Sequence, residues 1–378
     1  MPQPFLAGYR VIDLSQYAPG PYGGQILADL GAHVVKVEPP GGEPMRTMGP
    51  VDSDGVSAWY KGMNRGKSVV ELNLKSDDGK RAFEALLARA DAMLESYRPG
   101  VLDRLGFSRA RLDELNPRLI HCSLSGWGQT GPYRLKGGHD TNYMSLMGGL
   151  AISGDGSAPA MAHPPTADYA SGMHAALSIN AALLGRDGPR GDGRGRFLDV
   201  SIAEAVLPWQ MLAFTSERRE GFAMERGAAL LNGGSAFYHL YETSDGRFVS
   251  LGAIELKFWA NFCTAVDKPD WIARQAEPLP QSKLTAEVAA LFSARSLADW
   301  VGILETVDCC FEAIHEIVDT LDHPHIKARG MVHEVGGSEP RVEVSYPAWV
   351  DGAPPPAPEP VRFASVDEVL EEWRQIKD

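Results

Sequence analysis

Short apolar runs alternate with helical patterns through the first part of the chain. Between these runs, apolar residues recur at helical spacing, and Gly31 ends the first helical pattern. Alternation of this kind is typical of a parallel sheet with helices on both faces, so it predicts a Rossmann-like α/β domain. The predicted elements are strands at 9–14, 33–38, 68–74, 92–97 and 118–125, a tight turn at 18–24, and helices at 25–30, 78–88 and 109–115.

The pattern changes near residue 168, where a long stretch rich in Ala and Met predicts a helix. Further on, Ser244, Asp245 and Gly246 separate two short apolar runs, which is a strong signal for a β-hairpin. Helical patterns follow the hairpin, and the chain ends in an amphipathic helix. The predicted elements here are helices at 169–184, 202–218, 255–265, 283–292, 297–306, 311–317 and 366–376, and strands at 197–200, 236–241 and 247–251.

These patterns predict two domains, as the length of 378 residues also suggests. The large α/β domain combines the N- and C-terminal parts of the chain, residues 1–198 and 334–378. A linker at 199–231 leads to a smaller α+β domain at 232–322. A return linker at 323–333 leads back to the large domain.

The composition is that of an ordinary globular protein, with 44% hydrophobic and 22% charged residues. The net charge of −13 argues against a general nucleic-acid binder. No apolar stretch reaches the ~18 residues of a membrane span, so no membrane insertion is expected. The N-terminus lacks the basic and apolar regions of a signal peptide, and we expect a cytoplasmic protein.

The first strand–helix–strand unit ends in Glu38 and resembles a dinucleotide-binding unit. The glycine spacing does not fit, because Gly20, Gly23 and Gly24 give G-x-x-G-G instead of G-x-G-x-x-G. NAD and flavin are therefore not expected as cofactors. The four cysteines include no C-x-x-C pair and the ten histidines are scattered, so no metal site is predicted.

Many short segments between residues 7 and 333 together resemble CoA-transferase family III, also called the CaiB/BaiF type. Within that family, narrower motifs resemble the α-methylacyl-CoA racemases, above all Gly-His-Asp-Thr-Asn-Tyr at 138–143. The segments similar to the whole family are 10–14, 27–32, 64–67, 97–101, 116–120 and 125–132. Those similar to the racemases are 138–143, 167–172, 232–238 and 252–255.

The resemblance implies a racemase that interconverts the (2R) and (2S) forms of 2-methylacyl-CoA thioesters. Removal of the α-proton needs a base, and inversion needs a second group that returns a proton on the opposite face. A histidine and a carboxylate suit these roles, because the environment can bring both pKa values near neutrality. The resemblance assigns the roles to His139 and Asp168, and it lets Glu255 orient the imidazole of His139.

Other interpretations of these residues stay open. Judged alone, His139 is a loop or core histidine, Asp168 a cap of the helix that follows it, and Glu255 a first-turn carboxylate. At a helix start, the free amides beside Asp168 could also hold the enolate oxygen. A family III transferase would use Asp168 as a nucleophile without need of His139. A non-catalytic acyl-CoA-binding protein is the third alternative.

The resemblance also implies where coenzyme A, as part of the substrate, would bind. Arg98 and Arg104 are the leading candidates for its phosphates, since Pro39 stands where some relatives carry an arginine. Lys75 and its neighbours would line the adenine side. The resemblance further implies an interlocked homodimer, and it leaves the acyl group open. The implied binding residues are Leu72, Asn73, Leu74, Lys75, Tyr97, Arg98, Arg104, Gly138, Asn142 and Tyr143.

Overall fold

The structure is a computed structural model that describes residues 4–221 and 224–376. By its internal contacts the chain divides into two compact units. The predicted domain limits stay a prediction. Residues 222 and 223 of the predicted linker lie outside the described residues. The large unit comprises the described parts of 1–147, 163–208 and 324–378, and the small unit those of 148–162 and 209–323.

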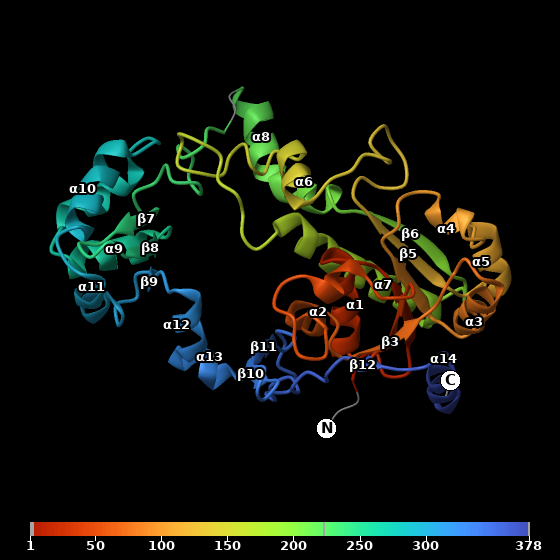
Figure 1. Ribbon diagram of the computed structural model, residues 1–378. Helices are drawn as coiled ribbons and strands as arrows, with labels where there is room; N and C mark the ends of the chain where they lie inside the picture. Colours follow the sequence, from red (N-terminus) through yellow and green to blue (C-terminus); the bar gives the residue numbers. More distant parts are fainter. Residues whose placement is uncertain (1–3, 222–223, 377–378) are drawn as a thin grey trace. The chain divides into compact units, whose positions relative to one another are not determined.

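A seven-stranded parallel sheet forms the centre of the large unit, which confirms the predicted α/β fold (Figure 1). Its strand order, β12-β3-β2-β1-β4-β5-β6, reverses direction on either side of β1, as in Rossmann folds. The C-terminal part of the chain supplies the edge strand β12, which pairs with β3. The strands are β1 (Arg10–Leu14), β2 (His33–Glu38), β3 (Lys67–Glu71), β4 (Ala92–Glu95), β5 (Ile120–Ser125), β6 (Arg196–Ser201) and β12 (Arg362–Phe363).

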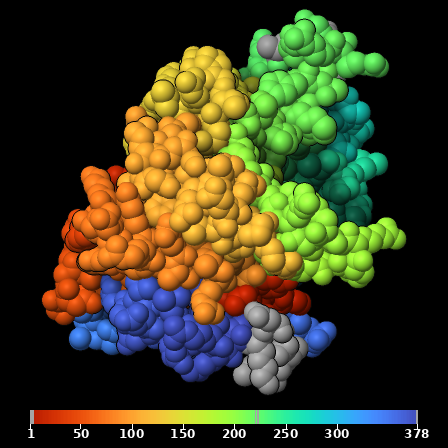
Figure 2. Space-filling model, turned by 90° about the vertical axis from the view of Figure 1, so that its right-hand side faces the viewer, coloured from red at the N-terminus to blue at the C-terminus, as the bar shows by residue number. Residues whose placement is uncertain are grey.

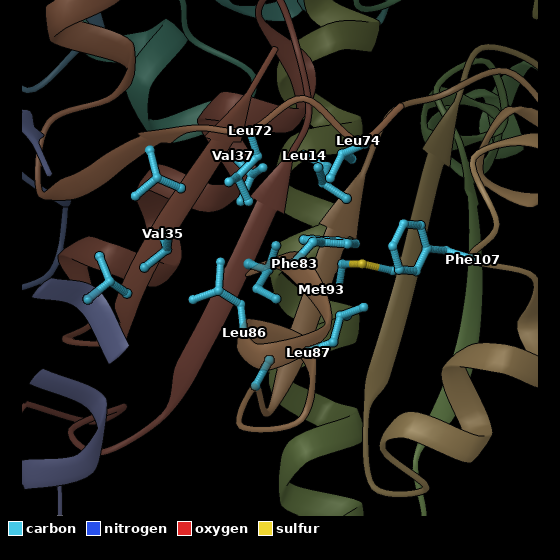
Figure 3. Close-up of a cluster of buried hydrophobic side chains, with 14 of the residues drawn as sticks. Leu14, Val35, Val37, Leu72, Leu74, Phe83, Leu86, Leu87, Met93 and Phe107 are labelled. Atoms are coloured by element: carbon cyan, nitrogen blue, oxygen red, sulfur yellow. The ribbon is translucent and has the colours of Figure 1, made fainter. Parts of the chain in front are cut away.

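Helices cover both faces of this sheet, and alternation along β1 assigns the faces. Ile12 and Leu14 lie in an apolar cluster with helices α3 and α14 (Figure 3). Asp13, between them, is on the opposite face, where a Cβ at Gly24 of helix α1 would lie 2.7 Å from its carboxylate. The helices of the cluster face are α3 (Asp77–Leu87), α4 (Val101–Arg104), α5 (Arg109–Leu115) and α14 (Val366–Gln375), and those of the opposite face are α1 (Pro19–Asp29) and α7 (Thr166–Asp187).

The terminal helix α14 completes the apolar cluster. Its buried residues Val369, Leu370 and Trp373 belong to the same cluster as Phe83 and Leu86 of α3. Figure 2 shows this C-terminal segment, in blue, against the orange surface of the preceding strands and helices. The amphipathic pattern predicted at 366–376 therefore corresponds to a helix that packs its apolar face on the core.

Helix α1 begins earlier than predicted, because the glycine-rich segment at 18–24 is helical and not a tight turn. Pro19 occupies the first turn, where a missing N–H costs nothing. The glycines are needed for close packing: a Cβ at Gly172 of α7 would lie 2.4 Å from the carbonyl oxygen of Pro19. A Cβ at Gly23 would likewise lie 2.9 Å from the carbonyl oxygen of Gly172. The two helix backbones therefore approach each other where neither carries a side chain.

The small unit contains a three-stranded antiparallel sheet, which confirms the predicted α+β character. The predicted hairpin around Asp245 is present. The predicted helix at 311–317 is wrong: residues 311–313 pair with β8, and the next helix begins only at Ile317. The elements are β7 (Tyr238–Glu242), β8 (Phe248–Gly252), β9 (Phe311–Ala313), α8 (Met211–Glu220), α9 (Leu256–Ala265), η3 (Pro269–Ala276), α10 (Ser282–Phe292), α11 (Leu297–Leu304) and α12 (Ile317–Asp322).

Several short elements of the chain were not predicted. The predicted helix at 202–218 is divided, since the segment that contains Pro208 forms 3-10 turns before α8 begins. None of the helices within 4–221 and 224–376 is long and apolar enough to cross a membrane. The additional elements are η1 (Pro44–Thr47), α2 (Ala58–Met63), α6 (Asp140–Leu146), η2 (Glu204–Gln210), α13 (Pro324–Arg329), β10 (Val332–Val335) and β11 (Arg341–Val344).

The close contact between α1 and α7 generates a stability prediction. We expect Gly172→Ala to lower the free energy of unfolding by about 1–3 kcal/mol, because the methyl group meets backbone that cannot move aside. The matched control is Gly185→Ala on the same helix, where a Cβ would meet nothing within 4 Å. That change should raise stability by up to ~1 kcal/mol through helix propensity. Urea unfolding measures both, and equal effects would contradict the steric role of Gly172.

Candidate functional site

The residues implied for ligand binding lie beyond the C-terminal ends of parallel strands. Residues 72–75 follow β3, Tyr97 and Arg98 follow β4, and 138–143 come after β5. The carboxyl ends of parallel strands share one edge of the sheet, and α/β proteins bind ligands at that edge, where the strand order reverses. Here the reversal lies at β1, between β2 and β4. The fold therefore gathers segments far apart in the sequence at one edge.

The peptide group between Gly138 and His139 is held at both of its ends. Tyr143 donates its hydroxyl hydrogen bond to the Gly138 carbonyl oxygen (2.7 Å), and the Asn142 side-chain oxygen accepts from the His139 N–H (3.0 Å). A Cβ at Gly138 would lie 2.8 Å from the Tyr143 ring, so glycine is required there. These two bonds, the peptide clamp, fix the backbone that carries the exposed His139 side chain at the start of α6.

Asp140, the next residue, connects this segment to α7. Its Oδ1 atom accepts hydrogen bonds from the backbone N–H groups of Ala167 (2.6 Å) and Asp168 (3.1 Å). We call these two bonds the Asp140 bridge. Because His139 precedes Asp140 and the bridge ends on Asp168 itself, the two residues proposed as bases are brought to neighbouring segments of the large unit.

The Asp140 bridge corrects two expectations about Asp168. Helix α7 begins at Thr166, so Asp168 lies inside the first turn and its carboxylate makes no capping bond. The interpretation of Asp168 as a helix cap is therefore wrong. The amides of Ala167 and Asp168 already donate to Asp140, so they are not free to hold an enolate oxygen.

The surroundings of Asp168 disfavour its charged form. Burial and, as the smaller cause, the negative charge of Asp140 together raise the pKa of the Asp168 carboxyl group to about 6. Burial, followed by the charge of Asp168, raises the pKa of Tyr143 to about 12, so its hydroxyl stays a donor. A carboxyl group with a pKa near 6 can both accept and return a proton close to neutral pH.

Aromatic side chains that the sequence analysis did not single out support α6. The Trp127 ring packs edge-on against Tyr143, with 4.9 Å between ring centroids, and against Tyr133 at 5.3 Å. The ammonium group of Lys136 lies 4.1 Å from the Tyr133 ring centroid. Trp127 lies inside the family-like segment 125–132, which was the only signal in the sequence for it.

Lys75, Arg98 and Arg104, the cations implied for phosphate binding, have exposed side chains at this edge. Within the described chain, none of the three forms an ion pair with a carboxylate, whereas Arg46, Arg65 and many others do. Positive charge without a partner is available there for an anion, in a chain of net charge −13.

The remaining implied binding residues have more constrained positions. The side chains of Leu72 and Leu74 are buried in the apolar cluster, so only their backbone can contact a ligand. The Asn73 side chain accepts from the Lys75 N–H (3.1 Å) and shapes the turn after β3. Burial raises the pKa of Tyr97 to about 12, and its ring packs beside the same cluster.

Glu38 stands where a dinucleotide-binding unit carries its ribose ligand, yet it is engaged within the protein. Its carboxylate accepts from the Tyr60 hydroxyl (2.6 Å) and pairs with Arg46 (2.7 Å). The side chain is only 1% exposed. The residues present therefore do not fit a ribose hydroxyl at this position, in line with the atypical glycine spacing.

Two cavities of the large unit border this cluster, one beside Tyr169 and one beside Trp127, although neither is lined by His139 or Asp168. The larger, of about 1170 Å³, lies between α1, α2 and the β10–β11 hairpin and is lined by the ion pair of Asp29 and Arg65. The smaller, of about 490 Å³, is lined by Trp127 and the following loop. Cavity size does not mark the candidate site, whereas the grouped chemistry around Asp140 does.

Glu255 belongs to the small unit, at the residue before α9. Its side chain is exposed and makes no hydrogen bond to the start of that helix. Glu255 thus lies one residue before the first turn in which the alternative interpretation placed it, and its carboxylate does not cap the helix. The predicted contact between Glu255 and His139 stays a prediction.

Comparisons with known proteins agree on one family. The sequence model described as CoA-transferase family III matches residues 6–361. α-Methylacyl-CoA racemase of Homo sapiens is 32% identical over 328 residues, covering 86% of this chain and 81% of that protein. Acetyl-CoA:oxalate CoA-transferase of Acetobacter aceti is 30% identical over 339 residues, covering 87% and 86%. A crystal structure of a CAIB/BAIF family protein from Brucella suis superposes with a TM-score of 0.82 at 25% identity, covering 98% of this chain and 99% of that one.

Proposed function

The chain belongs to CoA-transferase family III, and we propose that it is an enzyme that racemises 2-methylacyl-CoA thioesters at the α-carbon. The observation that carries the proposal is the Asp140 bridge, which ties the His139 segment to the amide of Asp168. A histidine and a carboxyl group with a pKa of about 6 are thereby supplied by adjacent segments. A two-base reaction needs such a pair.

The reaction consists of two proton transfers through an enolate. Ionised Asp168 takes the α-proton of one enantiomer, and the electron pair of the C–H bond moves into the thioester as an enolate. Protonated His139 then delivers a proton to the other face of the α-carbon. The opposite direction exchanges the roles, with neutral His139 as base and protonated Asp168 as acid. No net proton is consumed, and no metal, NAD or flavin is required.

The peptide clamp supports the role of His139. A general acid or base works only when it is held in a defined direction toward the reacting atom. Tyr143 and Asn142 both hold the His139 peptide, although the ring itself is exposed.

The second candidate is a CoA-transferase, and the similarity to the Acetobacter aceti enzyme favours it. In that reaction ionised Asp168 attacks the thioester carbonyl and expels the CoA thiolate, which leaves a mixed anhydride. His139 has no required role there. The racemase-like segments at 138–143 and 252–255 favour the first candidate.

The coenzyme A part of the substrate is assigned to the edge formed by the ends of β3 and β4. Lys75, Arg98 and Arg104 provide charge for its phosphates, and the backbone of 72–75 borders the adenine side. The acyl end then points toward Asp168. Glu255 completes the proposal as a group that orients His139 from the small unit.

The proposal extends to an interlocked homodimer. Helix α7 exposes Met173, Leu177 and Leu184, with fractional exposures of 54%, 64% and 73%, on the side away from α1. Their spacing of four and seven residues places them on one helix face. An apolar stripe of this kind is typical of a surface that another chain covers.

The first test follows the α-proton in deuterated water. We expect 2-methylacyl-CoA to gain deuterium at the α-carbon without any carboxylate acceptor, because the racemase exchanges this proton with its bases. His139→Ala and Asp168→Ala should each slow racemisation by at least ~100-fold, because inversion needs both groups, whereas the base that remains can still exchange the α-proton of one enantiomer. Mass spectrometry measures the exchange, and chiral chromatography measures the racemisation.

The same experiment separates the candidates. Exchange of CoA between acids that depends on an added carboxylate, lost in Asp168→Ala and kept in His139→Ala, would support the transferase. Near-normal racemisation by a folded His139→Ala variant would contradict the two-base assignment. Circular dichroism of both variants checks the fold.

Arg104 provides a test of the ligand assignment. We expect Arg104→Ala to raise the KM for acyl-CoA about tenfold and to change kcat much less, because the phosphates lie far from the α-carbon. The control is Arg81→Ala, an exposed arginine paired with Asp78, which should leave KM unchanged. An unchanged KM in Arg104→Ala would remove this residue from the phosphate site.

The interlocked dimer predicts an unusual exchange behaviour. The native particle should have twice the chain mass of 40.9 kDa by sedimentation equilibrium. Two differently tagged preparations should form no mixed dimers when combined in the native state, because interlocked chains separate only on unfolding. Mixed dimers should appear after joint denaturation and refolding. Rapid native exchange would contradict interlocking, and a monomer would contradict the dimer itself.

A further inference from the structure

We propose that Asp140 is a positioning residue of this site, one that holds Asp168 by its backbone and keeps negative charge beside its carboxyl group. The inference rests on the proposed function, since it gives Asp168 a catalytic role. Nothing in the family-like motif itself requires this role for Asp140. It follows from the contact between Asp140 and the start of α7.

The geometry of the Asp140 bridge is specific. A single oxygen, Oδ1, accepts from both the Ala167 and Asp168 amides. Ala167 is fully buried, so this end of α7 cannot shift without loss of packing. Two hydrogen bonds to one carboxylate oxygen therefore fix the backbone of Asp168 relative to α6. A displacement of about 1 Å at a catalytic group can cost about 100-fold in rate.

The charge on Asp140 is not neutralised by a cation. Among the residues of 4–221 and 224–376, no lysine, arginine or histidine forms an ion pair with it. Its stabilisation comes from the two amides and the positive end of the α7 dipole. Its negative charge therefore acts on Asp168 without a compensating positive group in contact with it.

The other groups around Asp168 come from four elements. Helix α6 contributes Tyr143, and α7 itself contributes Tyr169. Helix α1, which packs on α7, contributes Tyr22, whose ring lies 4.8 Å edge-on from Tyr169. The positive charge of Arg98, which follows β4, lowers the pKa of Tyr143, whereas the nearby carboxylates raise it. Within this set Asp140 is the charged group that acts directly on Asp168.

The two roles of Asp140 can be separated by two substitutions. Asp140→Asn keeps an oxygen that can accept both amide hydrogen bonds, but it removes the charge. Asp140→Ala removes both the bonds and the charge. Because a nearby negative charge disfavours ionisation of a carboxyl group, both changes should lower the pKa of Asp168. Only Asp140→Ala should also loosen the start of α7.

The experiment combines two readouts on the full chain. Carbon-13 NMR of the aspartate carboxyl groups, with the Asp168 signal assigned by Asp168→Asn, gives its titration directly. The pH dependence of α-deuterium exchange gives the acidic limb of activity. Since the base form of Asp168 is present above its pKa, a lower pKa moves this limb to lower pH.

We expect both substitutions to lower the pKa of Asp168, and with it the pH of the acidic limb of the exchange profile, by about 0.5 to 1. Asp140→Asn should keep the plateau of exchange within about threefold, whereas Asp140→Ala should lower it at least tenfold through misplacement of Asp168. The matched control is Ser365→Ala, which removes the cap of α14, also in the large unit. It should lower stability and change neither readout.

The outcomes separate this inference from the proposed function. An unchanged pKa of Asp168 in both Asp140 variants would overturn the positioning role. Equal plateau rates of deuterium exchange in the two variants would overturn it as well. If the unaltered protein exchanges no α-proton, the proposed function fails, yet the NMR titration still decides whether Asp140 acts on Asp168. Should Asp140→Ala not fold, Asp140→Asn and its NMR titration remain decisive.

Discussion

The contact between α1 and α7 is the constraint on which the candidate site depends. Two glycines, Gly23 and Gly172, let the helix backbones meet, and a methyl group at Gly172 would strike the Pro19 carbonyl oxygen at 2.4 Å. This contact fixes the position of α7 relative to α1 and the sheet. Asp168 lies four residues before Gly172, which is about one helical turn, so the packing of the small residues also sets the height of the carboxyl group.

A second set of contacts ties α6 to the start of α7. The peptide clamp holds the Gly138–His139 peptide at both ends, and the Asp140 bridge fastens the next residue to the start of α7. The six residues 138–143 are thus held as one unit, and the His139 side chain within it remains exposed. Several positions of the motif therefore fix the backbone around His139. The chemistry proposed for His139 depends on this fixed backbone.

The sequence predicted the alternation of strands and helices well, because each strand and helix carries its own local pattern. It missed what depends on distant contacts. The glycines at 18–24 suggested a turn, since the partner helix that requires them begins almost 150 residues later. The apolar run at 311–317 suggested a helix, but Phe311 and Ala313 pair with β8 instead. In the site, Asp140 and Ala167 are 27 residues apart, so no local spacing could reveal their bond.

One carboxyl group, Asp168, would serve either of the two candidate reactions, and its raised pKa of about 6 does not choose between them. An attacking nucleophile needs only the ionised form, whereas an acid–base pair needs both forms within reach of working pH. Burial alone would raise this pKa, so the added charge of Asp140 matters chiefly to a group that must also return a proton. Proton transfer would use both forms of Asp168 together with the held His139 segment, whereas acyl transfer would use only the ionised form of Asp168.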